Sequence, residues 1–164
     1  MKRLAFVAAL LLSFTCLAVA QSRAFGLRVG HNMEFSYQYE FSYPHFLEVD
    51  LGMDTTGANG FVLTGTYNWV LANPAWTREG EWTLYAGPGA SLGYVYDVRG
   101  SRNDNKAELM TAVALQLGLE YCIWEHLALS ADLRPLIGFH FGSGRFYRSG
   151  MYGFIPSLAV RYRF

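Results

Sequence analysis

The chain has 164 residues, enough for a single domain. Hydrophobic residues make up 52% of it and aromatic residues 16%, whereas charged residues make up only 16%, a low share of charge for a water-soluble domain. The formal net charge is zero, so the charge balance gives no indication of a nucleic-acid partner.

The N-terminus has the pattern of a secretory signal peptide. A basic start is followed by an apolar run from Leu4 to Leu12, and Ala18-Val19-Ala20 precedes Gln21. These features are the charged region, the apolar region and the small-residue cleavage site of a leader. We therefore expect a signal peptide at 1–20 and a single mature domain at 21–164.

Two other interpretations of the leader stay open. The apolar run could be an uncleaved anchor, although it is shorter than the roughly 18 residues that span a bilayer. Cys16 could carry a lipid, although Ser13-Phe14-Thr15 before it fit a lipobox poorly.

Cleavage would leave Cys122 as the lone cysteine, so the fold needs no disulfide. No later segment offers an apolar transmembrane helix, so a membrane location would require strands.

Residues alternate strictly soon after the leader. From Phe25 to Tyr43 the odd positions are bulky and mostly apolar, and the even positions are small or polar, which is the period of a β-strand. The stretch exceeds the roughly 9–11 residues of one membrane-crossing strand, so it must contain a turn. A three-residue turn at Gly30–Asn32 preserves the observed faces. It places Arg28 directly opposite Glu34, on the same face.

The alternation continues to the C-terminus and predicts eight strands. They are expected at 24–29, 33–41, 46–53, 61–71, 81–96, 107–122, 127–141 and 154–164, with local interruptions at Pro88, Pro135 and Pro156. Polar or glycine-rich connections separate them, notably at 97–106 and at 142–151. Little helical periodicity follows the leader, so we expect an all-β protein.

An even number of strands, each with one apolar face, predicts an antiparallel up-and-down barrel. Eight strands leave an interior just wide enough for side chains. The small and polar face fits into that space, whereas the Leu, Phe, Tyr and Trp face does not. We therefore expect a transmembrane barrel with its apolar face toward lipid and its polar face inside. The alternative is a lipocalin-like soluble barrel, whose exterior would carry more Lys and Glu.

The inward polar residues are expected to form one network that fills the barrel. Its predicted members are Arg28, Glu34, Gln38, Glu40, Glu48, Asp50, Gln116, Glu120, Asp132, Arg134 and Arg161. Unpaired buried charge is costly, so we interpret the network as a satisfied polar core that plugs the barrel. A gated polar channel is the functional alternative.

Aromatic residues gather at the predicted strand ends, as in the two girdles of a membrane barrel. The girdle expected at the end of the barrel where the chain terminates comprises Trp69, Trp82, Tyr121, Trp124, Tyr162 and Phe164, together with Phe25, Phe41 and Phe46. The girdle expected at the other end comprises Phe61, Tyr94, Tyr96, Phe139, Phe141, Tyr152 and Phe154.

The last stretch, 154–164, alternates apolar with polar residues and ends on an aromatic carboxy-terminus, Phe164. It resembles the closing strand of a bacterial outer-membrane β-barrel. Gly26-Leu27-Arg28-Val29-Gly30, Leu117-Gly118-Leu119-Glu120-Tyr121 and Arg161-Tyr162-Arg163-Phe164 are similar to small eight-stranded, porin-like outer-membrane proteins. The resemblance implies a place among outer-membrane lipids and recognition of Phe164 by the barrel assembly machinery. With Phe164 on the periplasmic side, the longest polar loops face outward.

No metal-ligand spacing, phosphate-binding loop or nucleophile elbow is present in the sequence. We therefore expect that the protein is not an enzyme and that it has no catalytic residues, no metal site and no cofactor. His140, near Ser143, is expected to face inward, whereas a lipid-modifying enzyme with a Ser–His pair would place it toward lipid. A structural or surface-interaction barrel is the favoured function; a narrow pore and a lipid-modifying enzyme are the alternatives. What the outer loops bind is left open.

Removal of the leader can be tested directly. We expect the protein purified from the outer-membrane fraction to begin at Gln21, because cleavage follows the small-residue site. Intact-mass spectrometry measures this. A mass that includes residues 1–20, or one that includes an acyl chain on Cys16, would contradict the expectation.

Overall fold

The structure, a computed structural model, describes residues 23–30, 32–54, 60–96, 107–142, 144, 146–149 and 156–164. The predicted leader at 1–20 lies outside these residues. Among the residues described, no helix is both long and apolar enough to cross a membrane.

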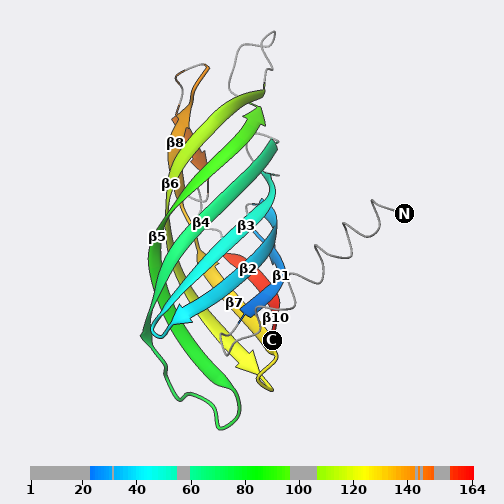
Figure 1. Cartoon of the computed structure of the whole chain (residues 1–164), viewed down its shortest axis with the longest axis vertical. Coiled ribbons are helices and arrows are strands. Elements are labelled where there is room, and N and C mark those ends of the chain that lie inside the picture. Colours follow the sequence, from blue (N-terminus) through cyan, green and yellow to red (C-terminus); the bar gives the residue numbers. More distant parts are fainter. Residues whose placement is uncertain are drawn as a thin grey trace, which may run out of the picture.

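Strongly tilted strands form one sheet that closes on itself (Figure 1). The segments are β1 (Arg23–Val29), β2 (Asn32–Ser42), β3 (His45–Asp54), β4 (Gly60–Ala72), β5 (Glu81–Tyr96), β6 (Ala107–Ile123), β7 (Leu127–Leu133), β8 (Leu136–His140), β9 (Phe146–Ser149) and β10 (Ser157–Arg163). All neighbouring segments pair antiparallel, and the pairing of β5 with β6 completes the ring.

The ten segments make eight barrel strands. β7 and β8 both pair with β6, one after the other, so they are two parts of one strand. β9 pairs with β8, and β10 pairs with β7, so these two segments follow each other along the next strand. The predicted all-β, eight-stranded antiparallel barrel is therefore confirmed.

The register of the first hairpin follows the predicted three-residue turn. Arg28 lies opposite Glu34, and Val29 lies opposite Met33. The backbone N–H of Gly30 donates to the carbonyl of Asn32 at 3.0 Å, across the turn. Because a strand has a period of two, this register fixes which residues of β1 and β2 face the interior.

The barrel is inverted relative to a soluble one. Phe35 is 72% exposed on the outer surface, whereas Arg28 is 1% exposed and Arg161 is 0% exposed. Burial alternates along β2 and along β6 in the same sense, with the polar face of β2 inside. This pattern excludes the lipocalin-like alternative, in which the apolar faces would point inward.

The turn end of the barrel is the end that carries Arg23, Phe164 and the turns at 43–44, 73–80 and 124–126. The loop end is the opposite one. The backbone N–H and carbonyl of Arg23 bond the carbonyl and N–H of Phe164, at 3.2 and 2.8 Å. The first and last described strands are thus joined at the turn end.

The prolines act differently from one another. Pro135 separates β7 from β8, and its carbonyl accepts a hydrogen bond from Leu115 at 3.2 Å, so the break stays attached to β6. Pro88 lies in the middle of β5 and pairs with Leu115 of β6 without a register shift. On the side of β4, Gly89 pairs with Thr66 and Ala86 pairs with Trp69, but the two positions between them are unpaired. Proline has no N–H to donate to that ladder.

The expectation that 142–151 is entirely loop is wrong. Phe146–Ser149 forms β9 and pairs with Leu136–Phe139. The local composition is rich in glycine and arginine and gives no clear strand pattern. The neighbouring strand β8 supplies the hydrogen-bonding partners, so tertiary context decides the conformation of this segment.

The interior also holds apolar side chains, which the predicted polar interior did not include. Phe46, expected in the outer girdle, is 9% exposed and faces inward, with its ring edge-on to Tyr85 at 5.2 Å between centroids. It shares the inward parity of Glu48, which explains the correction. Nearer the loop end an apolar inner cluster comprises Val62, Val95, Met110, Ala112, Ala114 and Leu136.

A glycine makes room for the inward tyrosine. Tyr85 of β5 pairs with Gly118 of β6. A Cβ atom on Gly118 would lie 2.3 Å from Cζ of Tyr85, which is far below a normal contact. The ring therefore occupies the space that any other residue at 118 would fill.

The Gly118 contact generates a stability prediction. Gly118→Ala should destabilise the barrel by about 1–3 kcal/mol, because the methyl group overpacks the interior against a buried ring. Gly65→Ala is the control, since nothing lies within 4 Å of a Cβ at that position. Urea titrations of protein refolded in lipid vesicles measure both. Equal unfolding midpoints for the two variants would show that Tyr85 does not occupy this space.

Candidate functional site in the charged barrel interior

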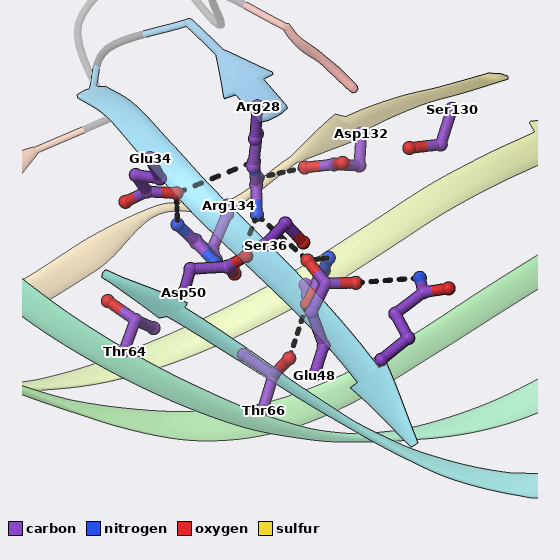
Figure 2. Close-up of polar contacts among 12 residues, drawn as sticks. Arg28, Glu34, Ser36, Glu48, Asp50, Thr64, Thr66, Ser130, Asp132 and Arg134 are labelled. Carbon is purple, nitrogen blue, oxygen red and sulfur yellow. Dashed lines mark hydrogen bonds and ion pairs between the residues drawn. The ribbon is translucent and has the colours of Figure 1, made fainter. Parts of the chain in front are cut away.

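Arg28 crosses the interior from β1 toward the opposite wall. Its Nη1 donates to Glu48 at 3.3 Å and to Asp50 at 3.4 Å, both on β3. Its Nη2 donates to Asp132 of β7, and its Nε lies 3.8 Å from Glu34 of β2. Figure 2 shows the side chain between Glu34 and Asp132. One guanidinium thus joins three other strands.

Arg134 occupies the break between β7 and β8. Its two terminal nitrogens donate to Glu34 of β2 and to Asp50 of β3, respectively. Glu34 also accepts a hydrogen bond from the Asn32 amide at 3.0 Å. Arg134 therefore connects the interrupted strand to β2 and β3 across the lumen. The planar guanidinium suits this role because its N–H donors point in fixed directions.

Arg161 of β10 forms the second half of the network. Its Nη2 lies 2.9 Å from Glu48, and its Nη1 lies 3.4 Å from Glu120. Its Nε donates to Ser36 at 2.9 Å, and its Nη1 donates to Ser130 at 2.7 Å. These contacts distribute its donors among four strands.

Glu48 is the acceptor at which the two halves meet. It is completely buried and lies in contact with both Arg28 and Arg161. The side-chain amide of Gln38 donates to it at 3.0 Å, and that of Gln116 donates at 3.1 Å. A carboxylate with this many donors is well satisfied, as a buried charge must be.

A layer of neutral polar side chains adjoins the charges. Thr66 donates to the Gln116 amide oxygen at 2.5 Å, and the Asn68 amide donates to Thr66 at 3.0 Å. The hydroxyls of Thr64 and Ser91 lie 2.7 Å apart. Gln116 was predicted in the network. The sequence analysis left out Thr64, Thr66, Asn68 and Ser91, although their inward parity was a signal that they belong to it.

Carboxylates outnumber arginines in the interior. Among the residues described, the buried charged side chains are three arginines (Arg28, Arg134, Arg161) and five carboxylates (Glu34, Glu48, Asp50, Glu120, Asp132). Oδ1 of Asp50 and Oδ2 of Asp132 have no hydrogen-bond partner within the described chain. The interior therefore has a negative electrostatic bias.

Ten of the eleven predicted network residues are buried and contact one another; the exception is Glu40. It is half-buried at the turn end, and the described residues make no ion pair with it. It lies two positions beyond Gln38 on β2, where the interior opens. The sequence correctly predicted that Glu40 lies on the inward face of β2. The strand period does not indicate how far along the barrel axis a residue lies, so it could not show that Glu40 is near the open end.

The six girdle aromatics are partly or largely exposed. Four of them are exposed, from 38% for Trp69 to 80% for Trp124, which lies on the β6–β7 turn, whereas Trp82 and Tyr121 are half-buried. Trp82 stacks on Tyr121 at 4.5 Å between ring centroids, and Phe164 packs edge-on to Phe25 at 6.0 Å. Trp76 was not among the predicted residues; it packs on Trp82 at 5.3 Å and is 65% exposed.

Four of the seven aromatic residues expected in the girdle at the loop end are exposed. Phe61, Tyr94, Phe139 and Phe141 are exposed, from 48% for Phe139 to 66% for Phe141. Tyr152 and Phe154, as well as the side chain of Tyr96, lie outside the described part of the structure.

Comparison with known proteins supports the fold. The structure superimposes on the crystal structure of the N-terminal β-barrel domain of Pseudomonas aeruginosa OprF with a TM-score of 0.62 and 14% sequence identity. The match covers 88% of this chain and 96% of that domain. No family model matches the sequence, and no curated protein matches it. At 14% identity this structural similarity shows a shared fold and nothing about function.

The network generates a prediction about its acidic residues. Glu34→Ala should cost about 3–5 kcal/mol of unfolding free energy, because it leaves buried arginine charge without its partner. Glu79→Ala, on the exposed turn between β4 and β5, should cost less than about 0.5 kcal/mol. Urea titrations in lipid vesicles measure both variants.

Double mutants refine this prediction. The pair Glu34→Ala and Arg134→Ala should lose less stability than the sum of the two single variants, by about 0.5–3 kcal/mol. The pair Glu34→Ala and Arg28→Ala should show a smaller coupling, because Arg28 lies 3.8 Å from Glu34. Additive losses in both cycles would mean that Glu34 is not held by either arginine.

Proposed function

We propose that this protein is an integral barrel of the bacterial outer membrane with a structural or surface-interaction role. Its apolar outer surface fits a surrounding of lipid, and the closed sheet leaves no unpaired edge in the hydrocarbon. The leader-like pattern at 1–20 supports export, and the terminal Phe164 is the expected recognition signal for barrel assembly. In this orientation the turn end faces the periplasm and the loop end presents its connections outside.

The observation that carries the proposal is the charged network across the lumen. Arg28, Arg134 and Arg161 reach from one wall to carboxylates on others, and each arginine is at most 8% exposed. Side chains locked in this way occupy the space that a solute would need. A barrel plugged by its own interior serves as a membrane-embedded support for its loops.

A narrow pore is the second candidate function, and the negative bias of the interior favours it. With five buried carboxylates against three arginines, any path through the lumen would attract cations and repel anions. Opening such a path would require the ion pairs to rearrange. A lipid-modifying enzyme has less support, because His140 is 3% exposed and faces the interior rather than the lipid surface.

Conductance in planar lipid bilayers tests the plug. The wild-type protein should give no steady single-channel currents, because the arginines close the lumen. The variant Arg161→Ser/Glu48→Ser removes one ion pair as a unit, without leaving a lone charge from that pair, and should give currents that favour cations. Steady currents from the wild type would overturn the closed-barrel proposal in favour of the pore.

A further inference from the structure

An apolar groove crosses the outer surface of the barrel close to the loop end. It has a volume of about 350 Å³ and lies over β1, β2, β3 and the start of β4, which are neighbours in the sheet (Figure 1). The paired positions Asn32, Asp54 and Gly60, at which β2 and β4 begin and β3 ends, come one residue beyond it. The groove therefore lies at one depth along the barrel, just below the loop end.

Two rows of outward side chains form the walls of the groove, and each row runs from strand to strand. One row comprises Leu27, Phe35 and Leu51, which pair in register across β1, β2 and β3. The row nearer the loop end comprises Val29, Met33, Met53 and Phe61, which pair across β1 to β4. All seven side chains are exposed, from 50% for Met53 to 72% for Phe35. The rows stand two residues apart along each strand, or about 6.8 Å.

The floor of the groove is strand backbone rather than charged side chains. It consists of the positions between the two rows, Arg28, Glu34 and Gly52. The side chains of Arg28 and Glu34 point into the lumen, and these residues are at most 3% exposed. Their backbone groups belong to the ladders of the sheet. A polar group in the groove would therefore find no partner, which is costly away from water.

The shape of the groove suits a straight hydrocarbon chain. Across four strands it extends for about three strand spacings, or roughly 14 Å. That length is close to the roughly 15 Å of hydrocarbon in one leaflet of a bilayer whose core is about 30 Å thick. No register shift interrupts the strands at these positions, so the walls do not bend along the groove.

The wall nearer the loop end can adapt to the chain that it contacts. Met33 and Met53 pair directly in this wall. Among the described residues they are the methionines on the outer surface, since Met110 is buried in the interior. Methionine is unbranched and flexible, so its side chain can close irregular gaps against a neighbouring chain.

We propose that this groove binds one saturated acyl chain of a lipid in the outer leaflet. The inference rests on the proposed function, because that function places the outer surface in lipid and the loop end outside. Between lipid and protein the attraction is close packing rather than the hydrophobic effect, because the surrounding hydrocarbon is equally apolar. A straight chain contacts both walls along their length, whereas a cis double bond bends the chain away from one of them.

Native mass spectrometry of the protein released from detergent micelles tests the proposal. The probes are dimyristoyl and dimyristoleoyl phosphatidylcholine, whose chains have equal length and differ in a cis double bond. The wild type should retain one molecule of the saturated lipid and bind it about threefold or more tightly than the unsaturated one. Met33→Trp and Met53→Trp fill the groove with an apolar side chain, so each should lose this preference.

The control variant is Leu115→Trp. Leu115 is 60% exposed on the outer surface of β6, outside the groove, so this variant should keep the preference for the saturated lipid. Equal retention of the two lipids by the wild type would overturn the proposal, even if a tryptophan variant fails to fold. An unchanged preference in Met33→Trp and Met53→Trp would overturn it as well. A lipid-free dimer would assign the groove to a second copy of the chain instead.

Flotation of the protein with lipid vesicles separates this inference from the proposed function. Protein that floats with the vesicles but shows no preference between the two lipids contradicts the groove alone. Protein that refolds without entering the vesicles contradicts the proposed membrane location itself.

Discussion

The pairing of buried arginines with carboxylates is the interaction on which the rest of this structure depends. A narrow barrel must fill its interior with side chains, and here Arg28, Arg134 and Arg161 supply much of that volume. A guanidinium placed there without acceptors would destabilise the fold by several kcal/mol. The carboxylates of β2, β3, β6 and β7 remove that cost. The same contacts place these side chains across the lumen.

These contacts also add a second set of links between strands. The backbone ladder joins each strand only to its neighbours, whereas the network joins β1 to β3 and β7, and β10 to β3 and β6. Links across the lumen oppose sliding of one wall relative to the other. They matter most where the ladder is interrupted, at the Pro135 break, where Arg134 reaches back to Glu34 and Asp50.

The uneven charge of the interior extends from the network to the turn end of the barrel. Carboxylates in excess give each buried arginine at least two acidic partners, and they also give the lumen a negative character. A pocket at the turn end, with Glu40 and Glu81 in its lining, adjoins the network and shares Gln38 and Glu120 with it.

The sequence by itself determined the strand period, the inverted faces and the register of the first hairpin, including Arg28 opposite Glu34. These are local properties, because residues two apart share a face and a turn of known length fixes the pairing. It also determined most of the buried polar set, since inward parity can be counted along each strand.

Only the tertiary structure decided which residues meet across the lumen. The contacts of Arg134 with Glu34 and of Arg161 with Glu48 join strands far apart in the chain, and they follow from the tilt and stagger of the closed barrel. Closure of the sheet into a barrel likewise decided the pairing of β9 with β8, the packing of Phe46 on Tyr85 and the position of Glu40 at the turn end. A period of two specifies a face, whereas depth and opposite partners are properties of the whole sheet.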